Sequence, residues 1–180
     1  LKPYTKTWPL TEAGRMIAMR TGLNNLVRRE TGKFCVDALY RNIDHKVAST
    51  LRAASRRGLD AVYAYEDGAL ETFTQARKLG LKCIYDLPIA YWETARRLMQ
   101  EEAERLPAWA ATLGGGIADS QEKLERKTRE LELADVVVVA SQFVKDSLPG
   151  WAGNKKTMVS PFGTPVLPGA PDKKETRLTG

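Results

Sequence analysis

The stretch that most constrains the fold is Ala134 to Leu148, which reads ADVVVVASQFVKDSL. It contains four consecutive β-branched residues, Val136 to Val139. A strand with one solvated face would alternate apolar and polar residues, and this run does not, so we expect a central parallel strand covered by helices on both faces. Ser141 follows the strand and is placed to cap a short helix. Ligands of open α/β sheets bind beyond the carboxyl ends of the strands, where Ser141 is expected to lie.

The rest of the chain alternates between strand-like and helix-like segments. Further strands are expected over residues 60–65 (DAVYAY), 82–87 (KCIYDL) and 156–160, and helical stretches over 70–80, 89–113 with an interruption at Pro107, and 119–133. Such alternation is typical of right-handed βαβ units and a parallel sheet. We therefore predict an α/β fold, a Rossmann-like three-layer α/β/α domain with a mostly parallel sheet.

Two helix starts can be assigned from residue types. Asp44 is a natural N-cap for a helix that runs to Arg57 and stops before Gly58. Residues 119–122 (DSQE) resemble a capping box, with Glu122 reaching back to the start of the next helix. The segment 35–40 stays ambiguous between strand and helix.

Length and composition favour one folded domain with flanking segments. The chain has 180 residues, of which 43% are hydrophobic, and contains no apolar run long enough to cross a bilayer; we expect no signal peptide. We expect an N-terminal arm and helices over 1–43, the Rossmann-like domain over 44–166 and a linker over 167–180. The two cysteines, Cys35 and Cys83, lack metal-ligand spacing and suit a reduced, cytoplasmic protein.

The positive charge is concentrated in the first third of the chain. Residues 1–58 hold 12 Lys and Arg against 4 Asp and Glu. Four of the polar residues, His45, Ser49, Arg52 and Arg56, share one face at helical spacing. This face could meet an anionic membrane surface or a phosphorylated ligand, or it could be an ordinary solvated face, and the sequence leaves these interpretations open.

Three stretches together resemble the N-terminal domain of a family-4-type glycosyltransferase of the GT-B fold. They are DAVYAYEDGAL from Asp60, KCIYDLP from Lys82, and LADVVVVASQFVKDSL from Leu133 followed by the turn Pro161-Phe162-Gly163. The match covers roughly residues 44–166 and rests on the order and spacing of the motifs. The family's first strand and its glycine-rich loop are not visible, and tyrosines stand where the family has histidines in two strands.

The resemblance implies one half of a GT-B enzyme, which transfers a sugar from a nucleotide-sugar donor to a sugar or lipid-linked acceptor. The donor is then a substrate, and neither a cofactor nor a metal is expected. Such a domain would work with its own C-terminal Rossmann domain and be inactive alone. Acceptor hydroxyls would meet polar groups at the strand ends, with Asp86 as the candidate catalytic base. The expected acceptor-binding residues are Tyr65, Glu66, Asp67, Asp86, Ser141 and Gly163.

Three other functions compete with this one. Dinucleotide binding is disfavoured because no G-x-G-x-x-G motif follows a strand. A nucleic-acid-binding module could use the basic first third, but the chain lacks a zinc pattern or a recognisable helix-turn-helix, so no nucleic-acid partner is expected. A non-catalytic relative that binds sugars or a polyanion stays open as the main alternative.

Overall fold

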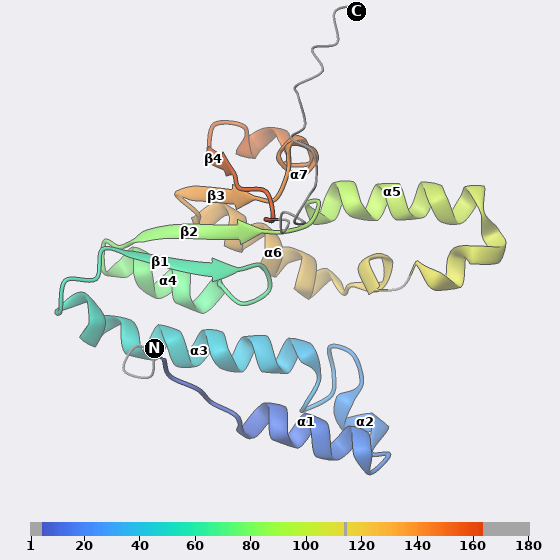
Figure 1. Ribbon diagram of the computed structural model, residues 1–180, viewed down its shortest axis with the longest axis horizontal. Coiled ribbons are helices and arrows are strands. Elements are labelled where there is room, and N and C mark those ends of the chain that lie inside the picture. The colour runs from blue at the N-terminus through green and yellow to red at the C-terminus, as the bar shows by residue number, and fades with distance from the viewer. Residues whose placement is uncertain (1–4, 114, 164–180) are drawn as a thin grey trace, which may run out of the picture.

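The computed structural model describes residues 5–113 and 115–163 and has at its centre a four-stranded parallel sheet (Figure 1). The strands are β1 (Ala61–Tyr65), β2 (Lys82–Leu87), β3 (Val136–Val139) and β4 (Lys156–Val159), adjacent in that order. The predicted α/β class with a parallel sheet flanked by helices, consistent with a Rossmann-like α/β/α domain, is confirmed. The valine strand β3 lies between β2 and β4 and is parallel to both.

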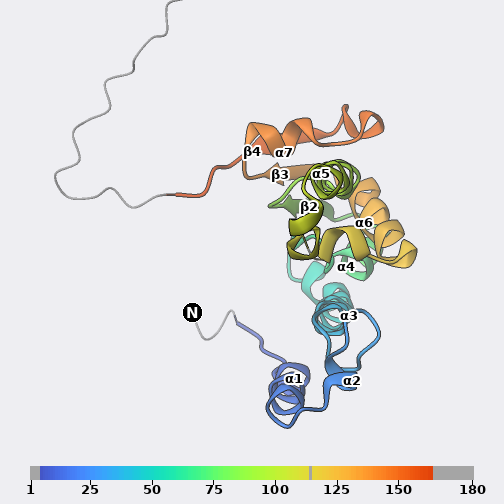
Figure 2. The ribbon, with the colours of Figure 1, turned by 90° about the vertical axis from the view of Figure 1, so that its right-hand side faces the viewer.

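Helices α4 (Leu70–Lys78) and α6 (Gln121–Leu133) cover one face of the sheet (Figure 2). Helix α3 (Val36–Ser55) packs on α4, and α1 (Leu10–Arg20) and α2 (Asn24–Val27) form the outer end of this stack. Helix α5 (Trp92–Arg105) extends away from the carboxyl end of β2, and the short 3₁₀ helices η2 (Pro107–Thr112) and η3 (Gly115–Ala118) return the chain to α6. The short α7 (Gln142–Asp146) and η4 (Gly150–Ala152) join β3 to β4. The linker expected over 167–180 lies outside the described residues.

The hydrophobic core lies between the sheet and the α4–α6 layer. Side chains from alternate positions of the strands point into it, and Val137 and Val139 are fully buried there with Tyr85 and Leu87. Phe73 from α4 and Leu131 from α6 complete this layer. The alternation of a strand places its even and odd positions on opposite faces, so the remaining positions form a second face.

That second face of the sheet is only partly covered by the described residues. Val136 and Val138 are half-buried, while Tyr63, Tyr65 and Met158 are 54%, 56% and 52% exposed. The cover expected on both faces of the valine run is therefore complete on one face and only partial on the other within the described part of the chain. An uninterrupted apolar run requires only that neither side be fully solvated, and half-burial satisfies that condition.

Both helix starts assigned from the sequence are corrected by the structure. Helix α3 begins at Val36 with the thiol of Cys35 accepting from the Ala38 N–H, and Asp44 lies inside the helix. Helix α6 is capped by Ser120, whose hydroxyl accepts the Lys123 N–H at 3.3 Å. The carboxylate that accepts the Ser120 N–H belongs to Glu30, 90 residues earlier, rather than to Glu122.

Candidate functional site

The carboxyl ends of β1 and β2 carry two groups of polar side chains that face opposite sides of the sheet. Glu66 and Asp67 follow β1 on the side of α6, whereas Asp86, near the end of β2, points to the partly covered face. The backbones are adjacent, because the Glu66 N–H donates to the Asp86 carbonyl at 3.1 Å. The acidic residues that the sequence placed in one cleft are therefore divided between two environments.

On the partly covered face, Asp86 is paired with an aromatic residue. The Tyr63 hydroxyl donates a hydrogen bond to Asp86 Oδ2. Asp86 is only 9% exposed to solvent. This bond to the carboxylate, together with desolvation, raises the pKa of Tyr63 to about 12, because ionising the phenol would put two negative charges side by side. Tyr65 stands beside Asp86 in the sheet register and packs edge-on against Tyr63, with ring centroids 6.1 Å apart.

On the helix side, two lysines of α6 meet four carboxylates. We call this set, formed by Lys123, Lys127, Asp37, Glu66, Asp67 and Asp119, the lysine–carboxylate cluster. Lys123 Nζ lies 2.7 Å from Asp37, 3.4 Å from Asp119 and 3.6 Å from Asp67. Lys127 Nζ lies 3.4 Å from Glu66, 3.4 Å from Asp119 and 3.8 Å from Asp67. Arg29 adds a further ion pair to Asp119.

The lysine–carboxylate cluster contains carboxylate oxygens that lack hydrogen-bond partners. Within the described part of the chain, Glu66 Oε1 and Asp67 Oδ1 are buried and accept no hydrogen bond. Burial raises the pKa of Glu66 to about 6, with the ammonium of Lys127 opposing the shift. Asp67 has a positive φ of 69°, a conformation that Asp tolerates better than most residues. The β1–α4 turn thus holds two carboxylates with unused acceptor capacity.

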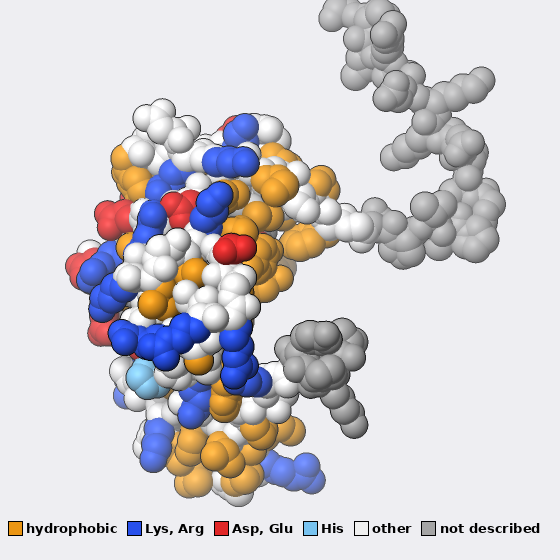
Figure 3. Space-filling model, turned by 90° about the vertical axis from the view of Figure 1, so that its left-hand side faces the viewer, with side chains coloured by type: hydrophobic (Ala, Val, Ile, Leu, Met, Phe, Trp, Pro, Cys, Tyr) orange, Lys and Arg blue, Asp and Glu red, His pale blue; other side chains and the backbone are white. Residues whose placement is uncertain are grey.

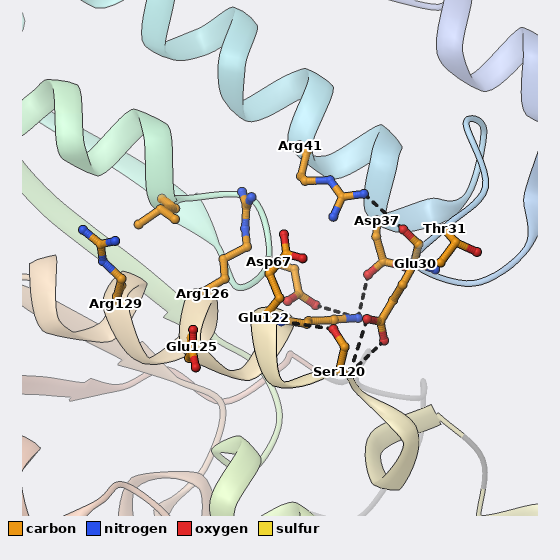
Figure 4. Close-up of a pocket in the computed structure, with 12 residues that line it drawn as sticks. Glu30, Thr31, Asp37, Arg41, Asp67, Ser120, Glu122, Glu125, Arg126 and Arg129 are labelled. Carbon is orange, nitrogen blue, oxygen red and sulfur yellow. Dashed lines mark hydrogen bonds and ion pairs between the residues drawn. The ribbon is translucent and has the colours of Figure 1, made fainter.

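A cavity of about 360 Å³ opens beside this cluster (Figure 4). It lies between the N-terminal halves of α3 and α6 and the turn that follows β1. Its volume is near the lower end of the range for small-molecule sites. The lining mixes cations with hydrogen-bond acceptors and comprises Glu30, Thr31, Asp37, Arg41, Asp67, Leu70, Ser120, Glu122, Lys123, Glu125, Arg126 and Arg129.

The structure places the six predicted acceptor-binding residues in different surroundings. Asp67 lines the cavity, and Glu66 belongs to the adjoining lysine–carboxylate cluster. Tyr65 and Asp86 occupy the other face of the sheet. Ser141 caps α7 by accepting the Val144 N–H at 3.3 Å, and Gly163 is exposed after the end of β4. The structure therefore brings Glu66 and Asp67 together and separates their side chains from those of Tyr65 and Asp86.

Sequence reasoning missed the basic side of the site. Lys123 and Lys127 lie four residues apart and so share one face of α6, and Asp119 precedes Lys123 by the same spacing just before the helix; that spacing was available in the sequence. The residues contributed by distant segments, such as Asp37, carried no comparable signal. Among the described residues, no group of three or more His, Cys, Asp or Glu side chains is arranged to hold a metal ion.

Comparison with known proteins yields no relative for this chain. No protein-family model matches the sequence, and no curated protein or solved structure is significantly similar to it. Across residues 5–113 and 115–163, no helix combines the length and the apolar character that a membrane crossing requires. The functional assignment therefore depends on the geometry of the site.

Proposed function

We propose that this chain is the acceptor-side half of a two-domain glycosyltransferase of the GT-B type, which transfers a sugar from a nucleotide-sugar donor. The observation that carries the proposal is the polar cavity beyond the carboxyl end of β1, in a parallel α/β sheet. Ligands of such sheets bind at this edge. A sugar needs many donors and acceptors in a small volume, and a cavity of about 360 Å³ lined by Arg, Lys, Ser, Asp and Glu supplies them.

Within this proposal, the acceptor sugar occupies the cavity and Asp67 binds its hydroxyl groups. Asp67 lines the cavity with its side chain 21% exposed, so its carboxylate can accept a hydrogen bond from a sugar hydroxyl. Ion pairs of Lys127 with Glu66 and of Lys123 with Asp67 hold the turn after β1 in place. Asp86 stays the candidate base, oriented by the Tyr63 hydroxyl; because its side chain faces the other side of the sheet, the reacting hydroxyl of the acceptor would have to extend from the cavity over the carboxyl ends of β1 and β2 to reach it.

The donor nucleotide would bind the second domain that the GT-B architecture requires. Transfer depends on holding both substrates at reacting distance, and one wall of the cleft cannot supply that positioning. The donor is a substrate in this scheme, and neither a cofactor nor a metal takes part. Buried free thiols at Cys35 and Cys83 suit the reducing cytoplasm in which we place the protein.

Acceptor binding by the 180-residue chain is the direct test. Saturation-transfer NMR with a panel of mono- and disaccharides should reveal at least one binder, and Asp67→Asn should weaken it by about tenfold, equivalent to the loss of one charge-assisted hydrogen bond. Asp146→Asn, the same chemical change on the exposed side of α7, should leave binding unchanged. If no sugar of the panel binds, the acceptor assignment is wrong.

Catalysis tests the second part of the proposal. The isolated chain should neither hydrolyse nor transfer from common sugar nucleotides, whereas a version joined to its donor domain should transfer. In that longer protein, Asp86→Asn should lower the turnover rate by two or more orders of magnitude, about the contribution of a general base. Asp146→Asn again serves as the control. Efficient transfer by the 180-residue chain alone would contradict the half-enzyme assignment.

A further inference from the structure

A second hollow of about 560 Å³ lies on the outer surface of the helical layer, between α3 and α4. We call it the α3–α4 groove. Helix α3 lines it with His45, Ala48, Ser49 and Arg52, α4 with Leu70, Glu71, Thr74, Gln75 and Lys78, and α6 with Arg129. It adjoins the acceptor cavity at Leu70 and Arg129 but extends away from it towards the C-terminal end of α4. His45, Ser49 and Arg52 are three of the four residues that the sequence placed on one polar face of α3.

The groove carries an excess of positive charge that the protein does not neutralise. Arg52, Lys78 and Arg129 line it with Glu71 as the one acidic residue of the lining. Glu71 is already engaged, since its Oε2 lies 2.8 Å from His45 Nδ1. Figure 3 shows the pale blue side chain of His45, the only histidine, with Lys and Arg side chains gathered above it.

The three cations of the groove are not neutralised by ion pairs within the described part of the chain. Along the described residues, no hydrogen bond or ion pair of the Arg52, Lys78 or Arg129 side chain is present in the structure. By contrast, Arg77 in the same layer pairs with Asp135 at 2.9 Å, and Arg126 pairs with Asp44 at 2.7 Å. Three like charges line this one groove without counter-ions among the described residues, so an anion would be attracted to it.

We propose that the α3–α4 groove binds a phosphate-bearing ligand. Arginine forks match the geometry of phosphate oxygens, and lysine adds a point charge. The hydroxyls of Ser49 and Thr74 and the amide of Gln75 provide the neutral donors that such sites use beside their cations. The phosphate is either part of a soluble compound or the headgroup of a lipid whose chains stay in a membrane. This site shares Leu70 and Arg129 with the lining of the proposed acceptor cavity, but the proposal does not depend on sugar binding or on transferase activity.

Pyrophosphate is the probe for the soluble form, and calorimetric titration of the full chain measures its binding. Saturable binding to one site is expected. The triple variant Arg52→Gln/Lys78→Gln/Arg129→Gln should weaken it by at least about tenfold, a loss of the size expected for charge-assisted bonds. All three side chains are exposed, so the variant should keep the wild-type thermal unfolding curve.

A second triple variant separates a site from the effect of net charge. Arg20→Gln/Lys145→Gln/Lys156→Gln removes an equal number of positive charges at exposed positions outside the groove. It should bind pyrophosphate within about twofold of the wild-type chain, because screening limits the influence of distant surface charges. Equal weakening in both triple variants would overturn the proposal, since the binding would then follow overall charge.

Vesicles distinguish the two sources of phosphate. Co-sedimentation with phosphatidylcholine vesicles that contain phosphatidic acid reports a lipid headgroup, and pure phosphatidylcholine is the blank. Binding that requires Arg52, Lys78 and Arg129 assigns the ligand to a membrane; binding of pyrophosphate alone assigns it to a soluble phosphate. Absence of saturable binding to either probe would overturn the proposal and leave the groove a solvated surface.

Discussion

Arg126 Nη2 lies 2.7 Å from Oδ2 of Asp44, a carboxylate contributed by a segment 82 residues earlier in the chain. Asp44 is fully buried and also accepts the backbone N–H groups of Glu71 and Thr72 at 2.9 and 2.8 Å. It therefore caps the N-terminus of α4 from a neighbouring helix. Helix α4 starts after Ala69, which offers no side-chain cap of its own, so its free N–H groups need an acceptor from elsewhere.

A second buried carboxylate completes this remote cap. Glu130 on α6 accepts the N–H groups of Asp67, Ala69 and Leu70, and Arg126 Nε lies 3.2 Å from its Oε1. Burial raises the pKa of Glu130 to about 7, with the backbone N–H donors and Arg126 opposing the shift. Three helices are thus joined at the start of α4 by two acids and one arginine.

Removing the Asp44 carboxylate from this remote cap should strongly destabilise the fold. Asp44→Ala leaves Arg126 largely buried with a lost partner and leaves two N–H groups without acceptors, so we expect the free energy of unfolding to fall by about 3–5 kcal/mol. Urea denaturation measures the change. Asp60→Ala, at an exposed position before β1, should alter stability by less than about 0.5 kcal/mol. A loss at Asp44 no larger than that at Asp60 would contradict the capping role.

The two faces of the valine strand predict opposite outcomes for one substitution. Val137 is fully buried against the helices, so Val137→Asp should abolish cooperative unfolding, because an unpaired carboxylate would be placed in the core. Val136, on the partly covered face, has Lys156 beside it in the register, and Val136→Asp should lower the melting temperature by only a few degrees. Thermal unfolding followed by circular dichroism compares them. If both variants lost cooperative unfolding, both faces of the strand would be buried in solution.

The strands could be predicted because their signal is local. Runs of β-branched and aromatic residues over 61–65, 82–87 and 136–139 bury one face against the helices whatever their partners are. Helix starts were harder to predict because their caps are not local. Asp44 has the residue type of an N-cap but serves a different helix, and the thiol of Cys35 is too weak an acceptor to be recognised as one.

The sequence could predict which residues lie at the strand ends, but not which side chains meet there. The rule that ligands bind at strand carboxyl ends located Glu66, Asp67 and Asp86 correctly along the sheet edge. It could not show that Asp86 faces away from the other two, since the pleat decides this only once the strand ends are fixed. Nor could it show that Lys123 and Lys127 neutralise the acids, because that pairing depends on how α6 packs against β1.

Glu66 predicts a measurable pH dependence of stability. Its pKa is raised from the ordinary value near 4.5 to about 6, so the folded chain binds more protons than the unfolded chain between these values. The free energy of unfolding should therefore fall as the pH rises from about 4.5 to about 6, by about 2 kcal/mol for this group. Glu66→Gln should remove that part of the decline. Urea denaturation across this range gives the two curves, and parallel curves would contradict the assignment.

The Tyr63–Asp86 pair gives the last prediction. The Asp86 carboxylate accepts the Tyr63 hydrogen bond and raises the phenol's pKa to about 12. Asp86→Asn removes the negative charge and leaves only a neutral acceptor, so the pKa of Tyr63 should fall towards the ordinary value of about 10. Ultraviolet difference absorbance follows phenolate formation, and Tyr63→Phe identifies which of the six tyrosines is responsible.

Asp146→Asn is the matched control for this titration, because it makes the same change at an exposed carboxylate that accepts only from Gln142. It should leave the Tyr63 titration unchanged. If Asp86→Asn also leaves it unchanged, the two side chains are not bonded in solution, and Asp86 loses the contact that orients it as a base. A shift at Asp86 alone would show that the Tyr63 hydroxyl holds its carboxyl group in solution, which is the contact that would orient it as a base.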